Sequence, residues 1–68
     1  MKLQTQYGIG ADWRDVPASA VPATCKMWLK AVASDTGRSV EAVSAELESG
    51  AVIELSAVEW HDRIRAAR

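Results

Sequence analysis

The chain has 68 residues, a hydrophobic content of 49% and a formal net charge of −1. This length allows one domain with a small core, and the apolar content excludes a disordered chain. A single cysteine excludes an intrachain disulfide, and no apolar run is long enough to cross a membrane. No segment resembles a signal peptide, so we expect a cytoplasmic protein.

Residues 2–7 (KLQTQY) alternate between two sets of side chains, with Leu3, Thr5 and Tyr7 on one side. This period of two predicts a strand, which Gly8 and Gly10 would end. Residues 8–21 contain a proline and no sustained period, and are predicted to form a loop.

A helix is predicted over residues 22–36. Pro22 would stand at the start of this helix. Proline suits that position because its missing N–H needs no partner there. An apolar stripe with helical spacing follows, formed by Val21, Cys25, Trp28, Leu29 and Val32. Gly37 supplies a residue that can adopt the left-handed conformation that closes a helix.

A second helix is predicted over residues 39–48. Ser39 is a favourable N-cap, and Glu41 would lie in the first turn against the positive end of the helix dipole. Val40, Val43 and Leu47 would form its buried stripe, and Gly50 would follow its end.

The last third of the chain predicts a strand over residues 51–55 and a third helix over residues 57–67. Ser56 and Glu59 match a capping box, while Leu55 and Trp60 have the spacing of a hydrophobic staple. The expected fold is therefore a mainly helical α+β single domain, residues 1–68, with three helices and one or two short strands. The two strands would pair, or one would add to the sheet edge of a partner.

Residues 29–53, LKAVASDTGRSVEAVSAELESGAVI, resemble the helix-turn-helix of excisionase and MerR-type DNA-binding domains. The resemblance implies that the helix over residues 39–48 enters the major groove. Its outward positions include Glu41, Glu46 and Glu48, whereas bases and phosphates favour Arg, Lys, Asn or Gln. A wing is also expected to be missing, because the strand would run directly into the capped helix at Ser56.

Charge is segregated along the chain. Residues 39–62 contain six acidic residues and no Lys or Arg, whereas residues 63–68 contain three arginines. An acidic stretch of this kind suits a basic or nucleic-acid-binding protein partner, although a solvated face is the simpler interpretation.

Trp13 lies outside every amphipathic period, between Asp12 and Arg14. This composition is typical of a binding hot spot, but the loop could equally fold back so that Trp13 covers the core. Trp28 and Trp60 fall on predicted core stripes.

No group of residues offers a nucleophile, a base and a charge stabiliser together, so we do not expect an enzyme. His61 has no second histidine at ligand spacing, and Cys25 falls on an apolar stripe. We therefore predict no metal site and no cofactor.

Two functions remain in view. The first is a non-catalytic protein-interaction module that occludes or regulates its partner, similar in kind to phage or mobile-element accessory proteins such as inhibitors of host defence. Its predicted contacts are Trp13, Arg14, Glu41, Glu46 and Glu48. The alternative is a small DNA-binding regulator of excisionase type. Its predicted contacts are Lys26, Lys30, Arg63, Arg65 and Arg68. Homodimerisation is compatible with either function.

Overall fold

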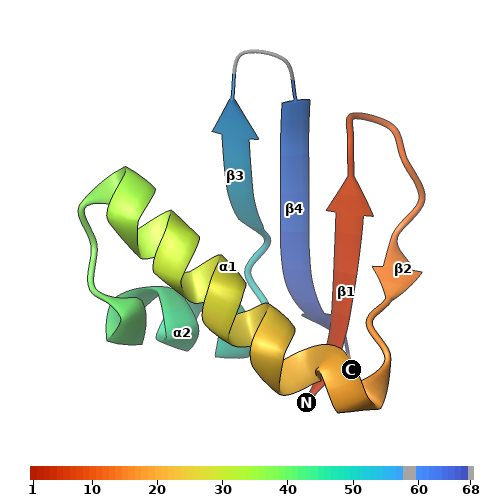
Figure 1. The fold of residues 1–68 in the computed structure, drawn as a ribbon, viewed down its shortest axis with the longest axis horizontal. Coiled ribbons are helices and arrows are strands. Elements are labelled where there is room, and N and C mark those ends of the chain that lie inside the picture. The colour runs from red at the N-terminus through yellow and green to blue at the C-terminus, as the bar shows by residue number, and fades with distance from the viewer. Residues whose placement is uncertain (58–59, 68) are drawn as a thin grey trace.

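Four antiparallel strands form a sheet that is accompanied by two α-helices and one 3-10 turn (Figure 1). The computed structural model describes residues 1–57 and 60–67. In chain order the elements are β1 (Lys2–Tyr7), β2 (Arg14–Asp15), η1 (Ala18–Ala20), α1 (Val21–Thr36), α2 (Val40–Glu48), β3 (Ile53–Ala57) and β4 (Trp60–Ala67).

The strand order β2-β1-β4-β3 places the first and last strands of the chain side by side at the centre of the sheet. Lys2 lies opposite Ala67, and Tyr7 lies opposite Asp62. On the other side of β4, Ile53 lies opposite Ile64. The central β1–β4 pairing therefore joins residues that are far apart in sequence, whereas β3 and β4 pair as consecutive strands.

Alternate side chains of these strands point to opposite sides of the sheet. One side, which we call the covered face, carries Leu3 and Thr5 of β1, Ile64 of β4 and Ile53 of β3, all buried. The other side, which we call the open face, carries the residues between them. Its members are Lys2, Gln4, Gln6, Asp15, Glu54, Ser56, His61, Arg63, Arg65 and Ala67.

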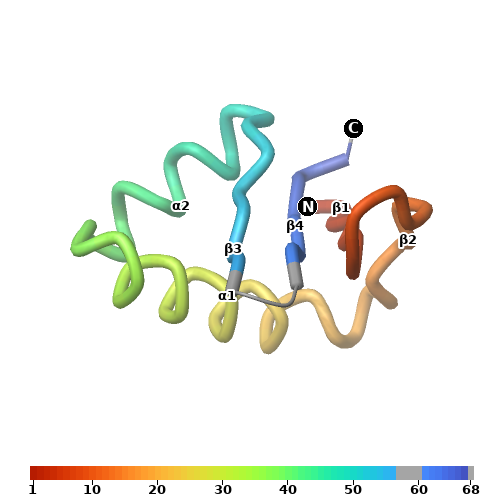
Figure 2. Tube along the Cα trace, turned by 90° about the horizontal axis from the view of Figure 1, so that it is seen from above, coloured from red at the N-terminus to blue at the C-terminus, as the bar shows by residue number. Residues whose placement is uncertain are grey.

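Helix α1 runs across the covered face, and α2 lies beside β3, at the end of the sheet away from β2 (Figure 2). Gly37 closes α1 with φ 70°, as predicted. Ser39 caps α2, and its hydroxyl accepts a hydrogen bond of 3.1 Å from the Ala42 amide. These local signals place the two helices close to where the sequence predicts them.

The core lies between the covered face and the two helices. It contains Leu3, Trp28, Val32, Ala33, Val43, Leu47, Ile53 and Ile64. The predicted stripe of α1 is confirmed, since Trp28 and Val32 are buried while Val21, Cys25 and Leu29 pack against the core. Trp13 is not part of this cluster.

The predicted third helix is wrong: residues 60–67 form strand β4, which is bonded to β1 on one side and to β3 on the other. Ser56 lies within β3, so it begins no helix, and Glu59 lies outside the described residues. The capping-box and hydrophobic-staple patterns over residues 55–60 favoured the local prediction of a helix. Pairing with β1, at the other end of the chain, and with the neighbouring β3 outweighs these local signals, since a helix cap contributes only about 0.5–2 kcal/mol.

The expected fold class is corrected accordingly. In place of three helices and one or two strands, the described residues contain two α-helices and a four-stranded antiparallel sheet. The expectation of a missing wing is also wrong, because β3 and β4 form an antiparallel pair directly after α2. The predicted loop over residues 8–21 contains β2 and η1 and ends in the first residue of α1.

Candidate interaction surfaces

Trp13 lies over the open face of the sheet. The Cζ atom of Arg65 is 4.0 Å from the centre of the Trp13 ring, and the Trp13 side chain is half-buried. A guanidinium over an indole face is attracted by the negative potential of the ring. The β1–β2 connection thus places an aromatic residue on the polar side of the sheet.

Hydrogen bonds hold Arg65 in position beneath the ring. Arg65 Nε donates to Gln4 Oε1 at 2.9 Å, and Gln4 Nε2 donates to Asp15 Oδ1 at 2.9 Å. Lys2 Nζ lies 3.5 Å from Asp15 Oδ2. The chain of contacts crosses β4, β1 and β2 and orients the guanidinium.

The hydrogen bond from Gln4 and the nearby charge of Lys2 lower the pKa of the Asp15 carboxyl below its ordinary value. Both contacts favour the charged form, and Asp15 is exposed, so burial opposes them little. The carboxylate is therefore ionised at neutral pH, when it can accept the bond that orients Gln4.

A second polar group occupies the β3 side of the open face. Glu54 Oε2 lies 3.4 Å from Arg63 Nε, and Glu54 Oε1 lies 3.3 Å from His61 Nδ1. These side chains are more than a third exposed, so the pairs contribute little to stability. The Glu54 carboxylate nevertheless balances the charge of Arg63. Among the described Lys and Arg residues of the open face, Arg65 is then the one without a carboxylate partner.

Arg14 does not share the surface of Trp13. It lies opposite Thr5, whose side chain is buried on the covered face, so Arg14 is directed to that side of the sheet. There it lines a shallow hollow of about 370 Å³ together with Tyr7, Gly10, Ala11 and Asp12. Neighbouring residues in the sequence therefore serve two separate surfaces.

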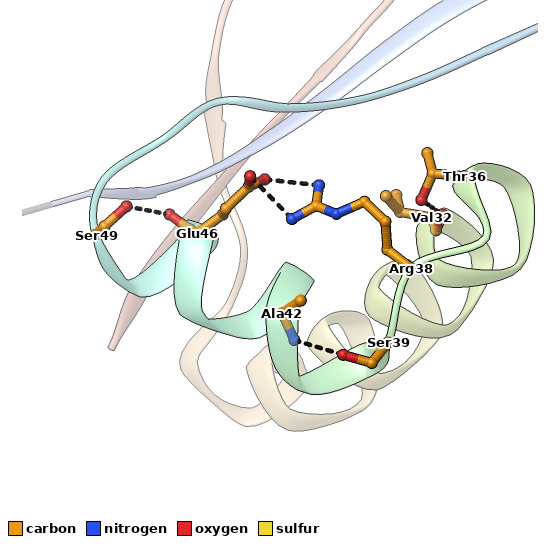
Figure 3. A network of polar contacts seen from close by, with 7 residues as sticks. All are labelled: Val32, Thr36, Arg38, Ser39, Ala42, Glu46 and Ser49. Atoms are coloured by element: carbon orange, nitrogen blue, oxygen red, sulfur yellow. Dashed lines mark hydrogen bonds and ion pairs between the residues drawn. The ribbon is translucent and has the colours of Figure 1, made fainter.

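The predicted acidic residues lie on α2, and one of them is already paired. Arg38 makes a two-pronged contact with Glu46, at 2.9 Å from Nη1 and 2.8 Å from Nη2 (Figure 3). Glu41 and Glu48 are exposed and form no ion pair with any described residue. The acidic surface of α2 is thus smaller than the sequence predicts.

The predicted contact residues fall into separate groups. Arg14 belongs to the edge strand β2, Trp13 lies against Arg65 of the central strand β4, and α2 with its glutamates lies at the end of the sheet away from β2 (Figures 1 and 2). The residues of the DNA-binding alternative are also divided: Lys26 and Lys30 are exposed on α1, whereas Arg63 and Arg65 point away from the helix-covered face. Arg68 lies outside the described residues.

A second concave region, which we call the Asp62 groove, lies between α1 and the sheet. It has a volume of about 210 Å³ and an almost entirely apolar surface. Its lining residues are Tyr7, Met27, Trp28, Ala31, Leu55 and Asp62. The sequence patterns did not predict this site, because they placed Asp62 on a helix and Tyr7 on a remote strand. The cross-strand pairs Tyr7–Asp62 and Leu55–Asp62 bring them together.

The described residues offer little else with catalytic chemistry. Burial raises the pKa of the Cys25 thiol, so the reactive thiolate is disfavoured. No group of three or more His, Cys, Asp or Glu is arranged for a metal ion in residues 1–57 and 60–67. Within the same residues, neither helix has the length and apolarity to cross a membrane.

Comparison of the chain with protein-family models, with curated proteins and with solved structures finds no match. Function is therefore inferred from the residues on these surfaces.

Proposed function

We propose that the protein is a non-catalytic binding module that docks a partner protein on the open face of its sheet. The Trp13–Arg65 stack is the observation that carries this proposal. Trp and Arg are among the residue types most enriched at the energetic centres of interfaces. Here the Gln4–Asp15 network holds Arg65, and Trp13 stacks on the Arg65 guanidinium. A pre-ordered pair loses little side-chain entropy on binding.

A protein partner suits this face better than nucleic acid does. Its three Lys and Arg residues are accompanied by the carboxylates of Asp15 and Glu54, so little positive charge remains for a phosphate backbone. The exposed glutamates of α2 would also repel DNA, although α2 is the helix that the helix-turn-helix resemblance would place in the major groove. The β3–β4 pair that follows α2 supplies the wing position of that alternative, which is why DNA belongs in the test.

The experiment uses three baits for affinity capture from the native host: the wild type, Trp13→Ala and a Glu41→Ala/Glu48→Ala control. Mass spectrometry identifies the proteins that each bait captures. The captured protein is then purified and titrated against each variant. We expect Trp13→Ala to weaken binding by more than about tenfold, because central anchors contribute roughly 2 kcal/mol or more. The control should change affinity by less than about threefold.

Circular dichroism would establish that Trp13→Ala remains folded. Binding that tolerates Trp13→Ala and Arg65→Ala alike would refute the open face as the docking surface. Duplex DNA binding that falls steeply with salt and survives both glutamate substitutions would favour the DNA-binding alternative.

A further inference from the structure

The Asp62 groove combines apolar walls with a carboxylate that lacks a cation. Asp62 is partly buried, whereas every other carboxylate whose side chain is described is exposed. No described Lys, Arg or His forms an ion pair with it, and no described side chain donates a hydrogen bond to it. Its directly opposite neighbours, Tyr7 and Leu55, provide aromatic and aliphatic surface.

Such an arrangement is unfavourable for an isolated carboxylate. Partial removal from water weakens its hydration, and apolar neighbours provide neither a hydrogen bond nor an opposite charge in exchange. By contrast, Glu46, Glu54 and Asp15 are more exposed and yet have cationic partners within the chain. Asp62 is therefore the carboxylate that would gain most from a cation supplied by another molecule.

The described side chains also leave the groove open at its rim. Met27 is 60% exposed and Tyr7 is 57% exposed, although both are large apolar residues at its rim. Its volume of about 210 Å³ lies below the roughly 300–1,000 Å³ of typical small-molecule sites. The size suits one long side chain better than a whole metabolite.

We propose that the Asp62 groove receives a lysine or arginine side chain of a partner protein. The aliphatic stem lies along Met27 and Leu55, and the cationic head reaches the Asp62 carboxylate. The aromatic rings of Tyr7 and Trp28 favour a cation nearby as well as an apolar stem. This site is independent of the Trp13–Arg65 stack, since Asp62 belongs to the covered face and Arg65 to the open face.

The test uses a minimal cationic probe, Nα-acetyl-lysine methylamide, titrated into the full chain and followed by amide NMR spectra. Nα-acetyl-norleucine methylamide serves as the control probe, because it keeps the four-carbon stem and lacks the amine. We expect saturable shifts at Tyr7, Leu55 and Asp62 with the lysine probe. Asp62→Asn should weaken its binding about fivefold, while the norleucine probe should be unaffected by that substitution.

Asp35→Asn is the matched control variant, since Asp35 is an exposed carboxylate on α1 without an ion-pair partner among the described residues. Met27→Ala, at an exposed position, tests the apolar wall if Asp62→Asn does not fold, and should weaken both probes. Absence of shifts in the groove, or equal weakening by Asp35→Asn, would overturn the proposal. A dimer in sedimentation that Asp62→Asn dissociates would also overturn it, in favour of a second copy of this chain.

Discussion

The two faces of the sheet are formed by alternating residues of the same strands, and they differ in the contacts that these residues make. On the covered face, Leu3 and Ile64 are completely buried beneath the helices. On the open face, their neighbours Gln4 and Arg65 form a polar network on which Trp13 rests. Apolar burial holds the first face together, while directional contacts among polar groups organise the second.

This difference separates stability from recognition within a very small chain. A buried methylene is worth roughly 0.8 kcal/mol, whereas exposed ion pairs contribute about 0–1 kcal/mol. Substitutions of the fully buried residues of the covered face should therefore destabilise the protein strongly, and those on the open face should alter binding with a smaller effect on folding.

The largest expected effect comes from breaking the covered face at Ile64. Ile64→Ala should lower the free energy of unfolding by about 2–5 kcal/mol, because it leaves a cavity at the centre of the sheet. Urea denaturation followed by circular dichroism measures the change. The neighbouring Arg65→Ala should cost only about 1 kcal/mol.

If Ile64→Ala does not fold, Ile64→Val provides a milder step of about 0.5–1.5 kcal/mol. Equal losses for the substitutions at positions 64 and 65 would contradict the division of labour between the faces.

A smaller effect should appear as coupling between Trp13 and Arg65. A double-mutant cycle with Trp13→Ala and Arg65→Ala should give an interaction free energy of about 0.5–1 kcal/mol, as expected for a partly exposed cation–π contact. The control cycle combines Trp13→Ala with Arg63→Ala. Arg63 shares the strand and face of Arg65 but pairs with Glu54. Coupling of Trp13 to Arg63 of the same size would show a general charge effect instead of a specific stack.

The smallest expected effect is the response of the open face to acid. The pKa of Asp15 is lowered in the folded protein, so its contribution to stability is present above its ordinary pKa of 3.8 and is lost as the pH falls through the lowered value. An NMR titration of the Asp15 carboxyl carbon measures this pKa directly.

Gln4→Ala should raise the Asp15 pKa more than Lys2→Ala does, because the hydrogen bond from Gln4 is the larger cause. A pKa of Asp15 that neither substitution changes would indicate that the network is absent in solution.

Much of the local structure follows from nearby residues. The alternation over residues 2–7 predicts β1, which spans Lys2–Tyr7, and Gly37 and Ser39 mark the junction of α1 and α2. The predicted strand over residues 51–55 is displaced by two residues and forms β3, Ile53–Ala57. Each of these signals acts within one turn or one strand, and here the tertiary structure agrees with it, unlike at the capping-box pattern of Ser56.

The candidate sites depend on contacts that such signals do not contain. The stack joins Trp13 to Arg65, and the Asp62 groove joins Tyr7 to Asp62, across most of the length of the chain. As a helix, residues 57–67 would place Arg63 and Arg65 about 200° apart around its axis, since each residue turns the helix by about 100°. As a strand, they place both arginines on one face.

The sequence by itself determined the first strand, the helical hairpin and its caps, because short-range hydrogen bonding and apolar periodicity decide them. Only the tertiary structure decided that residues 60–67 form the second central strand, since one of its two backbone partners, β1, comes from the opposite end of the chain. The same pairing decided where Trp13, Arg65 and Asp62 lie. The surfaces proposed for binding are therefore products of long-range strand pairing.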